Sequence, residues 1–110
     1  MRLVAVFSLT LLLGAFSSIS HAKDFYQVPL PADAREFARL DSKMPAVMSF
    51  FSQQNVADLR AYYIQQLGQP NSEQMLYGRE NLYFTVNNKQ VRILISSRND
   101  WRQVDIMVQN

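Results

Sequence analysis

The sequence of 110 residues contains no cysteine, a single histidine and only three glycines. The histidine, His21, lies in an N-terminal segment that we expect to be removed. A mature chain with neither cysteine nor histidine cannot form Ser-His-Asp or Cys-His catalytic sites, and it lacks the usual ligands of zinc, copper and haem. Gly68 and Gly78 are too far apart to form a phosphate-binding loop. We therefore expect no metal site and no cofactor, and we assign no catalytic residue.

The first 22 residues are predicted to be a signal peptide. Arg2 supplies a positive start, residues 3–16 form an apolar run, and Ser20 and Ala22 are small side chains at the positions that cleavage requires. A membrane anchor is the alternative, but the run is shorter than the roughly 20 residues that span a bilayer. Cleavage after Ala22 would leave 88 of the 110 residues. We expect a periplasmic or secreted bacterial protein with no membrane span after cleavage.

Charge is nearly balanced in the expected mature chain. The whole sequence has 11 basic and 9 acidic side chains, and Arg2 is lost with the signal peptide. The two signs are interspersed, and no basic stripe is present that could neutralise a row of phosphates. We therefore expect no nucleic acid among the partners.

A single amphipathic helix is predicted after Asn55. Asn55 is a good N-cap, and Asp58 lies near the positive end of the helix dipole. Gly68 can adopt the left-handed conformation that ends a helix, and Pro70 prevents its continuation. The apolar residues recur at steps of three and four and so share one face: Val56, Leu59, Tyr63 and Leu67. A lone helix of this length needs an apolar partner to be stable.

The remaining apolar segments read as strands. The expected strands are 46–52, 73–77, 82–86, 91–95 and 104–108. Asn87 and Asn88 tolerate the positive φ angles of a two-residue hairpin turn, and this turn would place Phe84 opposite Val91 and Tyr83 opposite Arg92. We expect an α+β domain in which one main helix packs on one face of an antiparallel sheet of about four to five strands.

The predicted domain organisation has three parts: a signal peptide at 1–22, an N-terminal arm or short helix at 23–45, and the α+β domain at 46–110. Asp33 could cap a short helix over residues 34–40. The alternative is an extended arm that lies on the domain, which Pro29 and Pro31 favour.

The chemistry left to the mature chain is that of carboxylates and lysine. A glycosidase needs two carboxylates that face each other across a cleft, and no pair among the acidic residues is singled out by its spacing. Asp58 is explained by the helix dipole, and Asp105 is explained as a partner of Arg92 on the polar side of the sheet. We therefore expect that the protein is not an enzyme, and a small carboxylate-dependent hydrolase is the alternative.

The sheet face opposite the helix is a candidate recognition surface. It would present Tyr83, Arg92, Asp105 and Met107, and aromatic, methionine and arginine side chains are typical anchors of binding surfaces. Trp101, in the loop before the last strand, is a second candidate anchor. Two alternatives remain open: the N-terminal arm could cover this face, and Trp101 could fold over the sheet edge as part of the core.

The order of one strand, a capped helix and a meander resembles small exported bacterial α+β domains of uncharacterised function. The resemblance covers residues 47–108 and is carried by Phe50 and Phe51 before the helix and by the apolar face within it. The sequence thus favours a non-catalytic exported module that binds an unknown protein or small molecule in the periplasm. A structural subunit or inhibitor that acts by strand pairing is a further alternative. The sequence specifies neither the oligomeric state nor the strand order.

Overall fold

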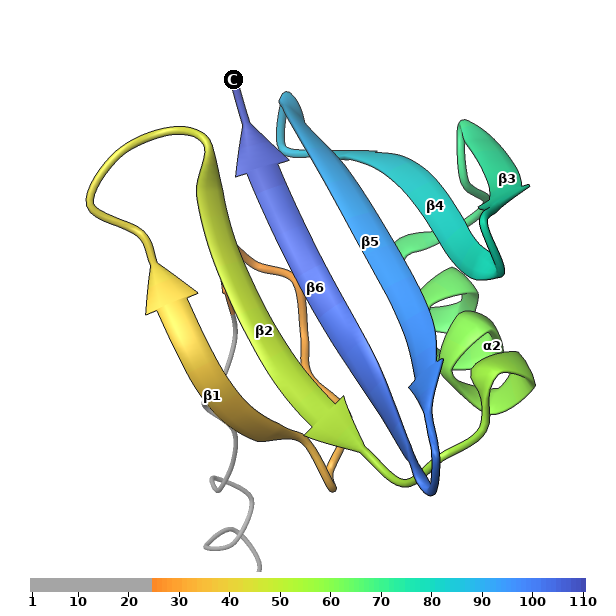
Figure 1. Cartoon of the computed structure of the whole chain (residues 1–110). Helices are drawn as coiled ribbons and strands as arrows, with labels where there is room; N and C mark the ends of the chain where they lie inside the picture. Colours follow the sequence, from red (N-terminus) through yellow and green to blue (C-terminus); the bar gives the residue numbers. More distant parts are fainter. Residues whose placement is uncertain (1–24) are drawn as a thin grey trace, which may run out of the picture.

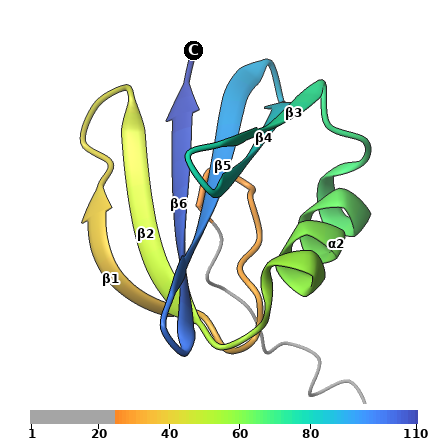
Figure 2. The same ribbon diagram turned by 45° about the vertical axis from the view of Figure 1, so that its right-hand side comes forward.

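The computed structural model describes residues 25–110, which form one six-stranded antiparallel sheet and one helix (Figure 1). The elements, in chain order, are β1 (Arg35–Leu40), β2 (Ala46–Ser52), α2 (Val56–Leu67), β3 (Ser72–Leu76), β4 (Arg79–Val86), β5 (Lys89–Arg98) and β6 (Trp101–Gln109). The strand order across the sheet is β1-β2-β6-β5-β4-β3. The sheet twists strongly, so that β3 and β4 run at a large angle to β1 and β2 (Figure 2).

The expected fold class is wrong. The described chain is mostly β, with six antiparallel strands in one sheet and one short helix, rather than an α+β domain of four to five strands. The additional strand is β1, which occupies residues where we expected a short helix or an arm. Among residues 25–110, no helix has the length and apolar character that crossing a membrane would require.

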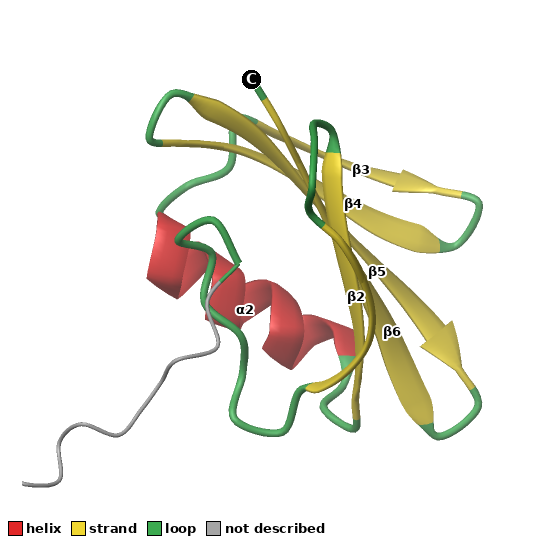
Figure 3. Ribbon diagram, turned by 90° about the vertical axis from the view of Figure 1, so that its left-hand side faces the viewer, coloured by secondary structure: helices red, strands yellow, loops and turns green. Residues whose placement is uncertain are grey.

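The hydrophobic core lies between the helix and one face of the sheet. Side chains alternate along β2, β4, β5 and β6, so that every second residue is buried on this face. Leu59 and Tyr63 of α2 are buried against it. Phe25 and Val28 are buried in the same cluster. Figure 3 shows the helix and the segment before β1 together on one side of the sheet.

The helix begins and ends where the sequence predicts. The side chain of Asn55 accepts a hydrogen bond of 2.8 Å from the backbone N–H of Asp58. At the other end, Gly68 has a φ angle of +90°, and its N–H donates to the carbonyl of Ile64 at 2.8 Å. Residues other than glycine rarely adopt this backbone conformation.

The β4–β5 hairpin also matches its prediction. Asn87 and Asn88 have φ angles of +52° and +66°, as a tight two-residue turn requires. Phe84 pairs with Val91, and Tyr83 pairs with Arg92. The consequence is that the buried apolar residues of both strands face the helix.

The predicted helix over residues 34–40 is wrong, because this segment is the edge strand β1. A β-bulge between Glu36 and Ala38 shifts its register against β2, and this bulge disrupts the alternation by which a strand is recognised in a sequence. Asp33 does not cap a helix. Instead its carboxylate accepts hydrogen bonds from Ser52 and Gln53 at the end of β2. The expected cleavage site after Ala22 lies outside the described residues.

Candidate functional site: an aromatic and arginine groove

The sheet face opposite the helix is not covered by any described segment, as the edge-on view shows (Figure 3). The residues before β1 pack on the helix side, so the alternative in which they cover this outer face is wrong. The side chains of Tyr83, Arg92 and Met107 are half-buried among their neighbours on the sheet rather than enclosed. Within residues 25–110, the outer face is therefore open.

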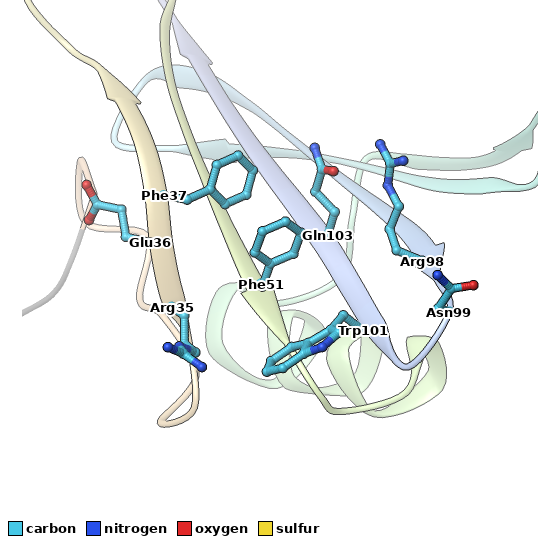
Figure 4. A pocket seen from close by; sticks show the side chains of 8 residues that line it. All are labelled: Arg35, Glu36, Phe37, Phe51, Arg98, Asn99, Trp101 and Gln103. Atoms are coloured by element: carbon cyan, nitrogen blue, oxygen red, sulfur yellow. The ribbon is translucent and has the colours of Figure 1, made fainter.

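A groove of about 650 Å³ opens on the outer face, at the end of the sheet where β1, β2 and β6 lie side by side (Figure 4). Its lining residues are Arg35, Glu36, Phe37, Phe51, Arg98, Asn99, Trp101 and Gln103. This volume lies within the usual range for small-molecule sites. The lining combines three aromatic rings, two arginines and two side-chain amides.

The aromatic rings form a continuous apolar floor. The rings of Phe37 and Phe51 stack with their centres 4.4 Å apart and an angle of 20° between their planes. The ring of Trp101 meets Phe51 edge-on at 6.3 Å. Aromatic contacts of this kind contribute more stability than the area they bury would supply by itself. Phe37 nevertheless keeps 48% of its surface exposed, which is a large exposure for a phenylalanine.

The charged groups of the groove are mainly cationic. The guanidinium carbon of Arg35 lies 5.8 Å from the centre of the Trp101 ring, within the range of a cation–π contact. Arg98 forms no ion pair or side-chain hydrogen bond with any residue in the described part of the chain. Figure 4 shows Arg35 and Arg98 on opposite sides of the groove, with the aromatic rings between them.

Glu36 is the one carboxylate among the lining residues, and it pairs with an arginine outside the groove. Both of its oxygens accept hydrogen bonds from the guanidinium of Arg39, at 2.8 and 3.0 Å. Together with Asp41, this pairing raises the pKa of Arg39 above its ordinary value. In Figure 4 the Glu36 carboxylate points away from the aromatic rings. Glu36 therefore does not neutralise the two arginines of the groove.

Local backbone geometry explains why these residues meet. Phe50 and Phe51 are adjacent in β2, so one faces the core and the other faces the groove. The bulge in β1 adds Phe37 between the paired positions of Glu36 and Ala38, and its ring lies against Phe51 on the outer face. Asn99 has a φ angle of +50° in the tight turn that reverses the chain between Arg98 and Trp101.

The candidate residues identified from the sequence share the outer face, but only Trp101 lines the groove. Tyr83 and Arg92 stack as expected, with 5.8 Å between the guanidinium carbon and the ring centre. Met107 pairs with Arg92 across β5 and β6. The Trp101 ring lies on the outer face with the groove residues, so the alternative in which it folds over the sheet edge as part of the core is wrong.

The expected pairing of Asp105 with Arg92 is wrong. The two residues lie in adjacent rows of the sheet, because Leu94 is the residue opposite Asp105. The carboxylate of Asp105 instead accepts hydrogen bonds from the Ser49 hydroxyl and the Gln103 amide. The guanidinium of Arg92 donates to the side-chain oxygen of Asn81 at 2.8 and 3.1 Å.

Sequence reasoning missed most of the groove. Phe51 could have been found, since two adjacent phenylalanines in a strand must face opposite sides of the sheet. Arg98 and Asn99 closely precede Trp101 in the sequence, but only the turn brings them to the same end of the face. Arg35 and Phe37 could not be assigned to this face without knowledge of the bulge.

Two acidic side chains lie close together away from the groove, at the other edge of the sheet. Glu73 forms a bidentate ion pair with Arg60 of α2, at 2.7 and 2.8 Å. Hydrogen bonding to Arg60 lowers the pKa of Glu73, whereas partial burial and the nearby Glu73 raise the pKa of Glu80. The ion pair between Glu73 and Arg60 attaches the helix to β3. This structural role explains why the acidic side chains lie here.

Comparisons of this chain with protein-family models, with curated proteins and with solved structures found no match.

Proposed function

We propose that the protein is a non-catalytic exported binding module that recognises its partner with the outer face of the sheet. The observation that carries the proposal is the groove itself. Three aromatic side chains and two arginines meet there in an accessible depression. Exposed aromatic and arginine side chains that cluster in this way are typical of interaction hot spots.

Two features favour binding over the alternatives. The groove supplies no pair of carboxylates, because its one acidic side chain is bound to Arg39, and a carboxylate-dependent hydrolase would need two. The edge strand β1 carries a bulge and three charged side chains. Bulges and charges on an edge strand hinder pairing with another chain, which disfavours strand pairing through β1.

Site-specific photocrosslinking tests the proposal in the full chain. We place p-benzoylphenylalanine at Gln103, which lines the groove, and separately at Gln66, which is exposed on α2. A discrete adduct that forms from the groove position and not from the helix position is expected. Equal labelling from both positions, or none from the groove, would contradict recognition through the outer face.

Export is tested on the same material. The chain recovered from the envelope of a bacterial host should have the mass expected after loss of residues 1–22. An intact mass in the cytosolic fraction would contradict the exported location, and it would leave the crosslinking result to be judged separately.

A further inference from the structure

We propose that the groove binds an extended acidic segment of a partner protein, in which an apolar or aromatic side chain is flanked by a carboxylate on each side. This inference rests on the proposed function and names the chemistry of the partner. The apolar side chain would lie on the rings of Phe51 and Trp101. The two carboxylates would pair with Arg35 and Arg98.

The charge of the groove selects an anionic partner. Arg35 and Arg98 both line it, and neither forms an ion pair among residues 25–110. A guanidinium group presents paired N–H donors that match the two oxygens of a carboxylate. Contact with the Trp101 ring also holds the Arg35 side chain over the groove, so that less conformational entropy is lost when an anion binds.

The position of the two arginines sets the spacing of the two acids. Arg35 lies on β1 and Arg98 on β5, and β2 and β6 separate these strands in the sheet. Three steps of about 4.8 Å between neighbouring strands, combined with an offset of two residues along β5, place the two backbone positions roughly 16 Å apart, and the long arginine side chains can shorten this span. An extended peptide advances about 3.3 Å per residue, so carboxylates about four residues apart can reach both guanidinium groups.

The open shape of the groove favours a polypeptide over a small molecule. Beyond the groove, the same outer face carries Leu94 and Met107, which are also half-buried. An extended segment that crosses several strands can use this additional apolar surface, whereas a small ligand in an open groove would leave much of its own surface in water.

A single-stranded nucleic acid fits the groove less well. Binding along a single strand requires a row of cationic side chains that follows the phosphates, and the groove supplies only Arg35 and Arg98. Binding of a single-stranded nucleic acid is therefore an alternative that the test must exclude.

The test uses the only tryptophan of the chain, Trp101, as a fluorescent reporter inside the groove. The probe is a synthetic peptide with one phenylalanine midway between two aspartates about four residues apart. A matched peptide carries asparagine in place of both aspartates. The full chain should change its emission with the acidic peptide, and the amide peptide should bind at least about tenfold more weakly.

Three variants assign the effect to the two arginines. Arg35→Gln and Arg98→Gln should each weaken binding of the acidic peptide about tenfold, by removal of one charge-assisted pair. Arg79→Gln removes the same charge from β4, which lies outside the groove, and it should leave binding unchanged. These side chains are exposed, and circular dichroism checks that each variant is folded.

Several results would overturn the inference: equal binding of the two peptides, no binding of the acidic peptide, an equal effect of Arg79→Gln, or tighter binding of an oligothymidylate. If any of these occurs while the Gln103 crosslink persists, the outer face still binds a partner and only the assigned chemistry is wrong. If the crosslink is absent as well, the proposed function fails.

Discussion

The carboxylate of Asp33 accepts hydrogen bonds from the hydroxyl of Ser52, at 2.9 and 3.0 Å. The same carboxylate accepts a backbone hydrogen bond from Gln53 at 2.8 Å and a side-chain hydrogen bond from Gln54 at 3.1 Å. Ser52 is fully buried at the end of β2. Asp33 thus connects the segment before β1 to the loop that leads into the helix.

Asp33→Ala should lower the free energy of unfolding by about 1–2 kcal/mol at neutral pH, because it removes the acceptor of several hydrogen bonds. Urea unfolding measures the change. Asp100→Ala, in the exposed turn between β5 and β6, should change the stability by less than about 0.5 kcal/mol. An equal effect of the two substitutions would contradict the role assigned to Asp33.

The contribution of Asp33 should depend on pH. Partial burial alone would raise the pKa of Asp33, but the hydrogen bonds from Gln53, Gln54 and Ser52 outweigh it and lower the pKa below the ordinary value of 3.8. The stabilisation is therefore complete above that ordinary value and is lost as the pH falls through the folded-state pKa. The stability difference between the wild type and Asp33→Ala should shrink on acidification, and a constant difference would contradict this linkage.

Tyr63→Phe should leave the free energy of unfolding unchanged or raise it by up to about 1 kcal/mol. The hydroxyl of Tyr63 is buried and has no hydrogen-bond partner among the described residues, so its removal relieves a desolvation penalty. Burial, with a smaller contribution from Tyr62, raises the pKa of Tyr63 well above its ordinary value of 10.0.

A group whose folded-state pKa is raised loses its stabilising contribution as the pH rises above the unfolded-state value. The wild type should therefore lose stability above pH of about 10 more steeply than Tyr63→Phe. Urea titrations at several alkaline pH values measure this. A loss of more than about 1 kcal/mol in the variant at neutral pH would show that the hydroxyl is hydrogen-bonded.

Asn88→Ala should destabilise the β4–β5 hairpin by about 1–2 kcal/mol, because Asn88 has a φ angle of +66° and a residue with a Cβ and no local hydrogen bonding is strained there. Asn88→Gly should be neutral or stabilising, since glycine adopts positive φ without strain. Gln90→Ala, at an exposed position of β5, is the matched control. Thermal unfolding should rank the glycine variant above the alanine variant, and the reverse order would contradict the turn geometry.

Glu73→Gln and Glu80→Gln should shift stability in opposite directions at neutral pH. The first weakens the ion pair with Arg60, and the second removes a carboxylate whose pKa is raised by partial burial and by Glu73. Because a raised carboxylate pKa opposes folding once the pH exceeds the unfolded-state value, the benefit of Glu80→Gln should disappear in acid. Melting temperatures at pH values of about 3 and 7 test both directions of change. A decrease in melting temperature for both variants at neutral pH would contradict the opposite roles of Glu73 and Glu80.

Quenching of Trp101 fluorescence should report the charge of the groove. Arg35 and Arg98 concentrate anions near the half-exposed ring, so iodide should quench more efficiently than caesium ions. Arg98→Gln should reduce the iodide effect, and Arg79→Gln should not. Equal quenching by the two ions at low ionic strength would contradict a cationic groove.

The parts of the fold that could be predicted are those in which local signals agree over a short stretch. Asn55 and Gly68 delimit the helix by hydrogen-bonding chemistry and backbone freedom alone. The β4–β5 hairpin follows from one turn and two alternating segments, since slipping the register by one residue would expose every apolar side chain.

The parts that could not be predicted depend on contacts between distant segments. Every residue of β1 is exposed, and its bulge removes the alternating pattern, so no local signal distinguished it from a helix. The groove requires Phe37 of this strand to meet Phe51 of the next. The partner of Asp105 depended on the offset between two rows of the sheet, which composition alone does not specify.

The central position of β6 has a consequence for folding. β6 pairs with β2 on one side and with β5 on the other, yet it is the last of the described strands along the sequence. Until β6 pairs, the β1–β2 hairpin and the β3–β5 segment have no strand to join them, and the long-range pairing that completes the sheet makes folding slow. A change that removes β6 would therefore leave β2 and β5 without their shared neighbour and divide the sheet into two parts.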